Sequence, residues 1–111
     1  METFRKGDVV LYPFPYTNLR GQKIRPCLVL SNHMNEDILL CQITSQNIPK
    51  DLFSISLSKD ETKNGTLHID SLIRTNMLFT AHRNDIIKII CKINDSKYLE
   101  VCNKIIEIIS K

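Results

Sequence analysis

The chain has 111 residues, 42% of them apolar and 24% charged, which suits one globular domain with a sizeable core but not two. No apolar run is long enough for a transmembrane helix, and the first residues lack the apolar stretch of a secretion signal. From the length we expect a single domain over residues 1–111, and from the lack of a signal segment we expect it in the cytoplasm; the net charge is +3.

The first half of the chain is typical of short strands separated by polar turns. Asp8–Tyr12 is rich in β-branched and aromatic residues and predicts a strand. The prolines and glycine of residues 13–23 predict a long irregular loop, because proline lacks an N–H donor. Strands are then predicted at Arg25–Ser31 and Ile38–Ser45, and Leu52–Ser58 alternates apolar and polar residues as a half-buried strand does.

The second half ends in a helix. Thr66–Thr75 is predicted to be extended, Met77–Thr80 fits either a strand or a helical turn, and Ile86–Ile93 predicts a late strand. Asp95 or Ser96 can cap a helix whose apolar residues recur at helical spacing and form a wide apolar face for packing on the sheet. Five to seven strands followed by one helix predict a mainly β fold, a small curved barrel with a C-terminal helix.

The excess positive charge is concentrated at the start of the chain. Residues 1–25 contain five basic and two acidic residues, whereas residues 26–111 contain ten of each sign. A local basic patch attracts phosphate groups even when the total charge is small. A solvated surface with a chance asymmetry explains the charges equally well.

Four cysteines, Cys27, Cys41, Cys91 and Cys102, lie far apart among aliphatic residues. None forms a Cys-x-x-Cys pair and no histidine is close to any of them in sequence, so the spacing does not predict a zinc site. We expect small buried apolar side chains in a reducing compartment, and neither a metal nor another cofactor.

Several motifs in a fixed order make the chain resemble one known family. The motifs are Gly7-Asp8-Val9-Val10, Pro13-Phe14-Pro15-Tyr16-Thr17, Arg25-Pro26 before an aliphatic strand, Ile43-Thr44-Ser45-Gln46, and the segment 71–80. Together they resemble the MazF/PemK-like toxins of type II toxin–antitoxin systems. The resemblance implies an SH3-like barrel of the CcdB/MazF type, a homodimer, a cognate antitoxin and metal-independent cleavage of single-stranded RNA.

By this resemblance Arg25 and Thr44 correspond to the catalytic residues of the family. RNA carries its own nucleophile, the 2′-hydroxyl, so a protein needs mainly to align the ribose with the phosphate. Arg25 can donate forked hydrogen bonds to phosphate oxygens and stabilise the added charge of the transition state. Thr44 can hydrogen-bond another oxygen or position a proton carrier. The expected products carry a 2′,3′-cyclic phosphate and a 5′-hydroxyl.

The residues expected to contact RNA are Phe14, Tyr16, Thr17, Asn18, Arg20, Lys23, Ser45, Gln46 and Arg74. The aromatic side chains can stack on unpaired bases or fix the loop to the barrel, and the basic residues can attract phosphates. Ser45 and Gln46 can line the groove or stabilise a turn. None of the three histidines, His33, His68 and His82, falls in a family motif, so no proton carrier is assigned, although His68 lies in a predicted strand and can reach the groove.

Two other functions remain open at this point. A related branch of toxins binds DNA gyrase without cutting nucleic acid, and an inactive barrel could bind RNA alone. The presence of both Arg25 and Thr44 in their motifs favours an endoribonuclease. The antitoxin is expected to be an acidic, partly disordered segment that competes with RNA for the basic groove.

Overall fold

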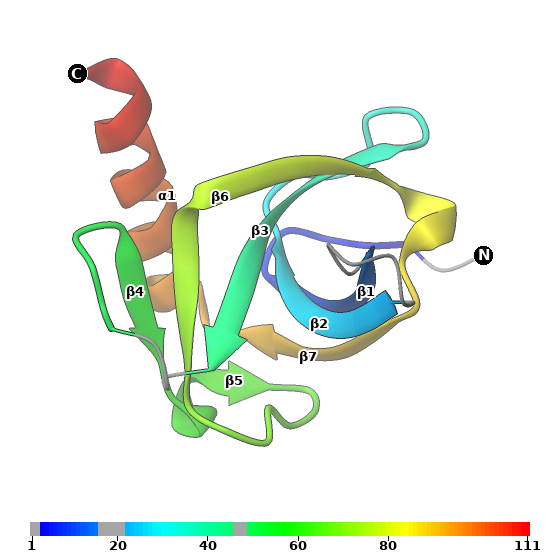
Figure 1. Cartoon of the computed structure of the whole chain (residues 1–111), viewed down its shortest axis with the longest axis horizontal. Helices are drawn as coiled ribbons and strands as arrows, with labels where there is room; N and C mark the ends of the chain where they lie inside the picture. The colour runs from blue at the N-terminus through cyan, green and yellow to red at the C-terminus, as the bar shows by residue number, and fades with distance from the viewer. Residues whose placement is uncertain (1–2, 16–21, 46–48) are drawn as a thin grey trace.

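A computed structural model of the chain describes residues 3–15, 22–45 and 49–111. The described residues form one antiparallel seven-stranded sheet, in the order β4-β6-β3-β2-β1-β7-β5, which curls into a half-barrel with the helix α1 at one side (Figure 1). The elements are β1 Asp8–Pro15, β2 Gln22–Val29, β3 Asp37–Ser45, β4 Ser54–Leu57, η1 Lys59–Glu61, β5 Thr62–Lys63, β6 Ser71–His82, η2 Arg83–Asp85, β7 Lys88–Ile93 and α1 Asp95–Ser110. The predicted mainly β barrel with a C-terminal helix is confirmed. None of the helices described is both long and apolar enough to span a membrane.

Two apolar clusters fill the curled sheet, and the central strands contribute to both. Val9 and Leu28 lie in a first cluster that contacts Val101 of α1, whereas their neighbours Val10 and Val29 lie in a second cluster. Side chains alternate between the two faces of a strand. Both faces are therefore covered at these positions, which explains why the sequence of these strands is continuously apolar.

The helix α1 is fixed at its beginning and extends away from the sheet at its end. Its N-cap is Asn94, whose side chain accepts a hydrogen bond from the Lys97 N–H at 2.8 Å, so the predicted caps Asp95 and Ser96 are wrong by one or two residues. The strand β7 ends at Ile93, and asparagine caps as well as aspartate or serine. The Tyr98 hydroxyl donates to the Leu30 carbonyl at 2.8 Å.

The packing of the apolar helix face is less complete than predicted. Val101 is fully buried, but Leu99, Ile106 and Ile109 are 60%, 55% and 73% exposed. The Lys97 ammonium pairs with the Glu61 carboxylate at 3.1 Å, so an ion pair supports the apolar contacts of the first turns. Burial raises the pKa of Glu61, but hydrogen bonds from Ser58 and Lys97 outweigh it and lower that pKa overall.

The loop predicted at residues 13–23 is wrong at both ends, because β1 continues through Pro15 and β2 begins at Gln22, while residues 16–21 lie outside the described residues. Pro13 and Pro15 pair with β2, while the pairing of β1 with β7 ends at Leu11. The prolines therefore occupy a stretch with a neighbour on one side only. A missing N–H donor is tolerated there because it can face the unpaired edge.

The strand β6 also differs from the sequence prediction. It covers Ser71–His82, so only the second half of Thr66–Thr75 is a strand, and the ambiguous Met77–Thr80 is extended. Its pairing with β3 passes from Leu78 opposite Cys41 directly to Arg74 opposite Gln42. The residues between them leave the ladder, and β6 bends sharply (Figure 1). The strands predicted at Leu52–Ser58 and Ile86–Ile93 are confirmed as β4 and β7, and both are shorter than predicted.

Candidate active site

The strands β2 and β3 are paired over one half of their length and separate over the other. Their ladder joins Val29 to Leu40, Leu28 to Cys41 and Cys27 to Gln42, and ends there. The Leu30 N–H donates to the Leu39 carbonyl at 2.8 Å. The backbone N–H groups of alternate β2 residues point toward the same neighbouring strand. After Leu30 and Leu28, the next N–H directed at β3 would therefore belong to position 26.

Position 26 is a proline, which has no N–H to donate. The ladder cannot continue through this residue, and the two strands diverge from it. If the register were extended across the gap, Arg25 would stand opposite Thr44, because their positions continue the series of paired residues. The Arg25-Pro26 pair of the sequence thus has a structural meaning. Proline opens the sheet, and the arginine lies at the opening.

A cleft of about 300 Å³ lies where the strands separate. We call it the β2–β3 cleft; it is lined by Leu11, Lys23, Ile24, Arg25, Pro26, Ile43, Thr44, Ser45, Leu67, His68, Ile69, Ser71 and Ile90. The structure thus brings together four residues predicted for the site, namely Lys23, Arg25, Thr44 and Ser45. It also adds His68, which the sequence analysis did not assign to the site.

The electrostatics of the β2–β3 cleft suit an anion. Its lining contains Lys23, Arg25 and His68 but no carboxylate. Arg25 is half-buried, and none of the carboxylates described pairs with it. An arginine without a carboxylate partner can direct its forked donors at a phosphate group. Among residues 3–15, 22–45 and 49–111, no cluster of His, Cys, Asp and Glu could hold a metal ion.

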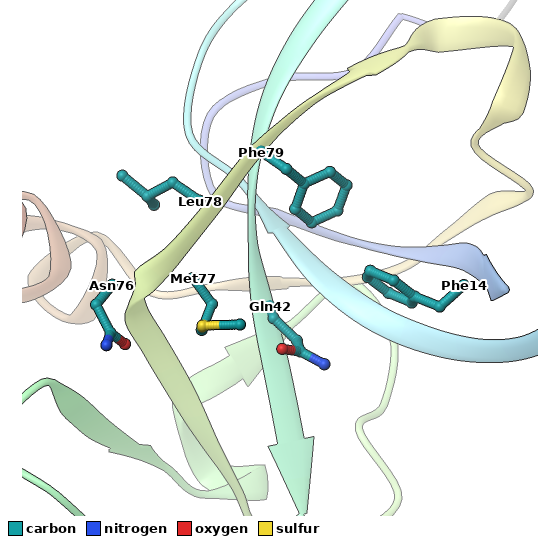
Figure 2. Close-up of a pocket in the computed structure, with 6 residues that line it drawn as sticks. All are labelled: Phe14, Gln42, Asn76, Met77, Leu78 and Phe79. Atoms are coloured by element: carbon teal, nitrogen blue, oxygen red, sulfur yellow. The ribbon is translucent and has the colours of Figure 1, made fainter. Parts of the chain in front are cut away.

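A second hollow, which we call the aromatic pocket, lies beside the bend of β6. It has a volume of about 270 Å³ and is lined by Phe14, Gln42, Asn76, Met77, Leu78 and Phe79. In the view of Figure 2, Gln42 and Met77 lie between Asn76 and the ring of Phe14. The residues that leave the β3–β6 ladder therefore form one wall of this pocket.

The residues of the aromatic pocket share a face of the sheet with Arg25 and Thr44. Directly opposed residues of antiparallel strands share a face, and Tyr12 opposes Arg25 while Phe14 opposes Lys23. Gln42 stands two residues before Thr44 on β3, so these side chains also share a face. The rings of Tyr12, Phe14 and Phe79 form a triangle with centroids 5.2–5.4 Å apart. The aromatic rings thus share one face of the sheet with the side chains of Lys23, Arg25 and Thr44.

Arg74, which the sequence analysis assigned to RNA binding, lines neither hollow. Its Nη2 atom lies 4.0 Å from the Asp51 carboxylate, and its buried Nε has no partner among the described atoms. Hydrogen bonds from the Ser54 hydroxyl and the Phe53 N–H, together with the charge of Arg74, hold the pKa of Asp51 below its usual range. This ion pair supports the segment that leads into β4.

Five residues assigned to RNA binding lie outside the described residues; they are Tyr16, Thr17, Asn18, Arg20 and Gln46. Sequence reasoning missed Gln42, and it considered that His68 can reach the groove without assigning it to the site. Alternation along the strand could have found Gln42, which stands two positions before Thr44. His68 carries no local signal, because its place depends on how the segment before β6 returns to the cleft.

The cysteines behave as the sequence predicts. Cys27, Cys41 and Cys91 are fully buried, Cys102 is half-buried, and none forms a disulfide. Burial raises the pKa of the Cys27 thiol to about 12 and, with the nearby Asp8 carboxylate, that of Cys91 to about 11. Buried thiols of this kind are poor nucleophiles.

Comparisons with known proteins agree with this geometry. MazF of Deinococcus radiodurans, solved in a MazE–MazF crystal form, superposes with a TM-score of 0.77 at 17% identity over 96% of both chains. An endoribonuclease from a mycobacterial species gives a TM-score of 0.74 at 9% identity, covering 99% of this chain and 94% of the other. No curated protein matches the chain.

These structural likenesses concern the fold, and a family model extends the match to the sequence. The model describes PemK-like, MazF-like toxins of type II toxin–antitoxin systems and matches residues 5–109. Nearly the whole chain is therefore covered, including Arg25, Thr44 and the whole of the described sheet. The chain belongs to the family of PemK-like, MazF-like toxins of type II toxin–antitoxin systems.

Proposed function

We propose that this toxin is an endoribonuclease that cleaves single-stranded RNA in the β2–β3 cleft without a metal ion. The observation that carries the proposal is the position of Arg25 and Thr44 at one cleft whose lining contains cations and no carboxylate. A polyanion meets no repulsive charge there. The solved endoribonuclease of the same fold is consistent with this activity.

In the proposed reaction the 2′-oxygen of a ribose attacks the adjacent phosphorus and displaces the 5′-oxygen of the next nucleotide. The 2′-hydroxyl loses its proton, and the departing 5′-oxygen gains one, so that a 2′,3′-cyclic phosphate and a 5′-hydroxyl result. Arg25 donates hydrogen bonds to the non-bridging oxygens, which gain charge in the transition state. The Thr44 hydroxyl donates a hydrogen bond to one of the same oxygens and so restricts the orientation of the phosphate group.

The aromatic pocket extends this site along the RNA strand. Gln42 and Thr44 are two residues apart on β3, which corresponds to about 7 Å. One nucleotide of an extended strand spans a similar distance, so a base next to the scissile phosphate can reach the pocket. Phe14 offers a ring for stacking, and Gln42 offers an amide with donors and an acceptor for a base edge.

We further propose that a cognate antitoxin covers this face and that the toxin acts as a cytoplasmic homodimer. MazF of Deinococcus radiodurans was solved with MazE, and a mycobacterial endoribonuclease was solved with its cognate antitoxin. An acidic segment of such a partner would neutralise Lys23 and Arg25 and compete with RNA. An antitoxin that binds tightly yet leaves RNA cleavage unchanged would contradict this placement.

The test is incubation of the purified protein with long single-stranded RNAs in EDTA. We expect discrete fragments with 2′,3′-cyclic phosphate ends. Arg25→Ala should lower the cleavage rate about 10²–10³-fold, the usual cost of removing one preorganised donor. Thr44→Val keeps the branched shape of the side chain and removes its hydroxyl, so it should also slow cleavage.

The matched control is Arg5→Ala, which removes an exposed arginine at the other end of β1. It should cleave RNA at the wild-type rate. If Arg25→Ala also retained that rate, or if well-folded wild-type protein cut none of a varied set of RNAs, the proposal would be wrong. Binding of RNA without cleavage would indicate an inactive RNA-binding barrel instead, and binding of DNA gyrase would indicate a protein-directed toxin.

A further inference from the structure

The proposed reaction needs a group that accepts the proton of the 2′-hydroxyl, and Arg25 and Thr44 cannot serve. A guanidinium stays protonated, and a threonine hydroxyl is a poor base. The lining of the β2–β3 cleft contains one other side chain of a kind that serves as a general base, the imidazole of His68. The charged groups that accompany it there are Lys23 and Arg25 of β2, and its own segment adds Asp70.

The segment that carries His68 is held in place on both sides. Gly65 has φ of +142°, and a Cβ atom at this residue would lie 2.0 Å from the Ile90 carbonyl oxygen. Only glycine permits this close approach to β7. Leu67, the neighbour of His68, is only 4% exposed and packs in the first apolar cluster.

The residues after His68 are fixed as well. The Asp70 carboxylate accepts a hydrogen bond from the Lys59 N–H at 3.0 Å, and the Ser71 hydroxyl donates to the Ile69 carbonyl at 3.0 Å. Ser71 then opens β6 opposite Ser45 of β3. His68 is therefore an exposed side chain on a backbone that its neighbours hold against the cleft.

The other two histidines have structural partners, whereas His68 has none in the described part of the chain. His33 accepts a hydrogen bond from the Phe4 N–H at 3.0 Å and stacks on its ring. His82 caps η2 by accepting from the Asn84 N–H at 3.1 Å. The ring nitrogens of His68 are thus available for a substrate.

We propose that His68 is the general base of the cleavage reaction, an inference that rests on the ribonuclease function proposed above. The neutral imidazole takes the proton of the 2′-hydroxyl while the 2′-oxygen forms its bond to phosphorus. The bond between phosphorus and the 5′-oxygen breaks, and the departing oxygen takes a proton from water. The imidazolium then releases its proton to solvent, which restores the starting state.

The test measures cleavage rate against pH at saturating RNA for the wild type, for His68→Gln and for the matched control His82→Gln. The wild-type rate should fall at acid pH, where an imidazole base is protonated. His68→Gln should be slower by about 100-fold or more, the usual contribution of a general base, and should lose this acid limb. His82→Gln should keep both the rate and the limb.

Two further measurements separate the proposal from a structural effect. Added imidazole should restore part of the activity of His68→Ala, which a folding defect would not allow. On an RNA whose 5′ leaving oxygen is replaced by sulfur, a group that departs without a proton, the loss in His68→Gln should persist.

Each contrary result is distinct. A wild-type rate in His68→Gln, an unchanged acid limb, or no rescue by imidazole would overturn the role of His68 while leaving the ribonuclease function intact. Restored cleavage of the sulfur substrate would make His68 the acid and not the base. Wild-type protein that cuts no RNA at all would instead refute the ribonuclease function itself.

Discussion

The paired and separated halves of β2 and β3 differ in backbone pairing, in burial and in the polarity of their side chains, although they belong to the same two strands. In the paired half, Leu28 and Cys41 face each other and are fully buried. In the separated half, Arg25 and Thr44 stand across a gap and are half-buried. The transition between the two halves occurs at Pro26, where the ladder loses a donor.

This difference shows how a small barrel can carry a polar site without weakening its core. The first half satisfies its backbone groups within the sheet and buries apolar side chains on both faces. The second half places Lys23, Arg25 and Thr44 at a cleft that suits an anionic ligand. Changes in one half should therefore affect stability, and changes in the other should affect RNA cleavage or binding.

The largest expected effect is in the paired half. Leu28→Ala removes a fully buried side chain from the first apolar cluster, and such changes cost about 2–5 kcal/mol of unfolding free energy. Urea denaturation should show this loss. The protein that remains folded should cleave RNA at the wild-type rate under native conditions. A selective loss of cleavage without loss of stability would mean that the two halves are not independent.

A smaller effect is expected at the aromatic pocket of the open face. Phe14→Leu keeps an apolar side chain but removes the ring, and a base–aromatic stack contributes about 1–3 kcal/mol to binding. The dissociation constant of a short RNA should rise accordingly, as fluorescence anisotropy would show, while the rate at saturation changes less. The matched control is Phe53→Leu, a partly exposed phenylalanine outside the pocket. Equal affinity of both variants would exclude stacking on Phe14.

The smallest expected effect is at the boundary itself. Pro26→Val supplies the missing N–H, and one added hydrogen bond to β3 would stabilise the fold by about 1 kcal/mol. The same bond should draw the strands together and narrow the cleft, so cleavage should become slower. Hydrogen exchange at position 26 would report the new bond. Rapid exchange there would show that another feature holds the strands apart.

Much of the fold could be predicted from local pattern. The apolar runs of β1 to β3, the alternation before β4 and the helical spacing of α1 each indicate an element within a few residues. The prolines at positions 13 and 15 misled the prediction, because the sequence does not tell which edge of a strand is unpaired. The bend of β6 was not foreseen either, since it arises from its pairing with β3.

The candidate site divides in the same way. Arg25 and Thr44 lie in short motifs, so the sequence identified them, and the cleft brings them to the same opening. No family motif contains His68, His33 or His82. The contacts that each histidine makes in the structure are what separate them. Gln42 gained its significance from the bent neighbour strand β6 and from Phe14, which lies two strands away in the sheet order.

The sequence by itself determined the periodicity of the apolar residues, the prolines that lack an N–H donor and the positions of the basic residues along the chain. Each of these depends on the chemistry of a residue and its nearest neighbours. Tertiary structure alone decided where the ladders end, how β6 bends, how much of α1 is exposed and which histidine reaches the cleft. These depend on the register between segments far apart in the chain. That register follows from the packing of the whole core and not from any single segment.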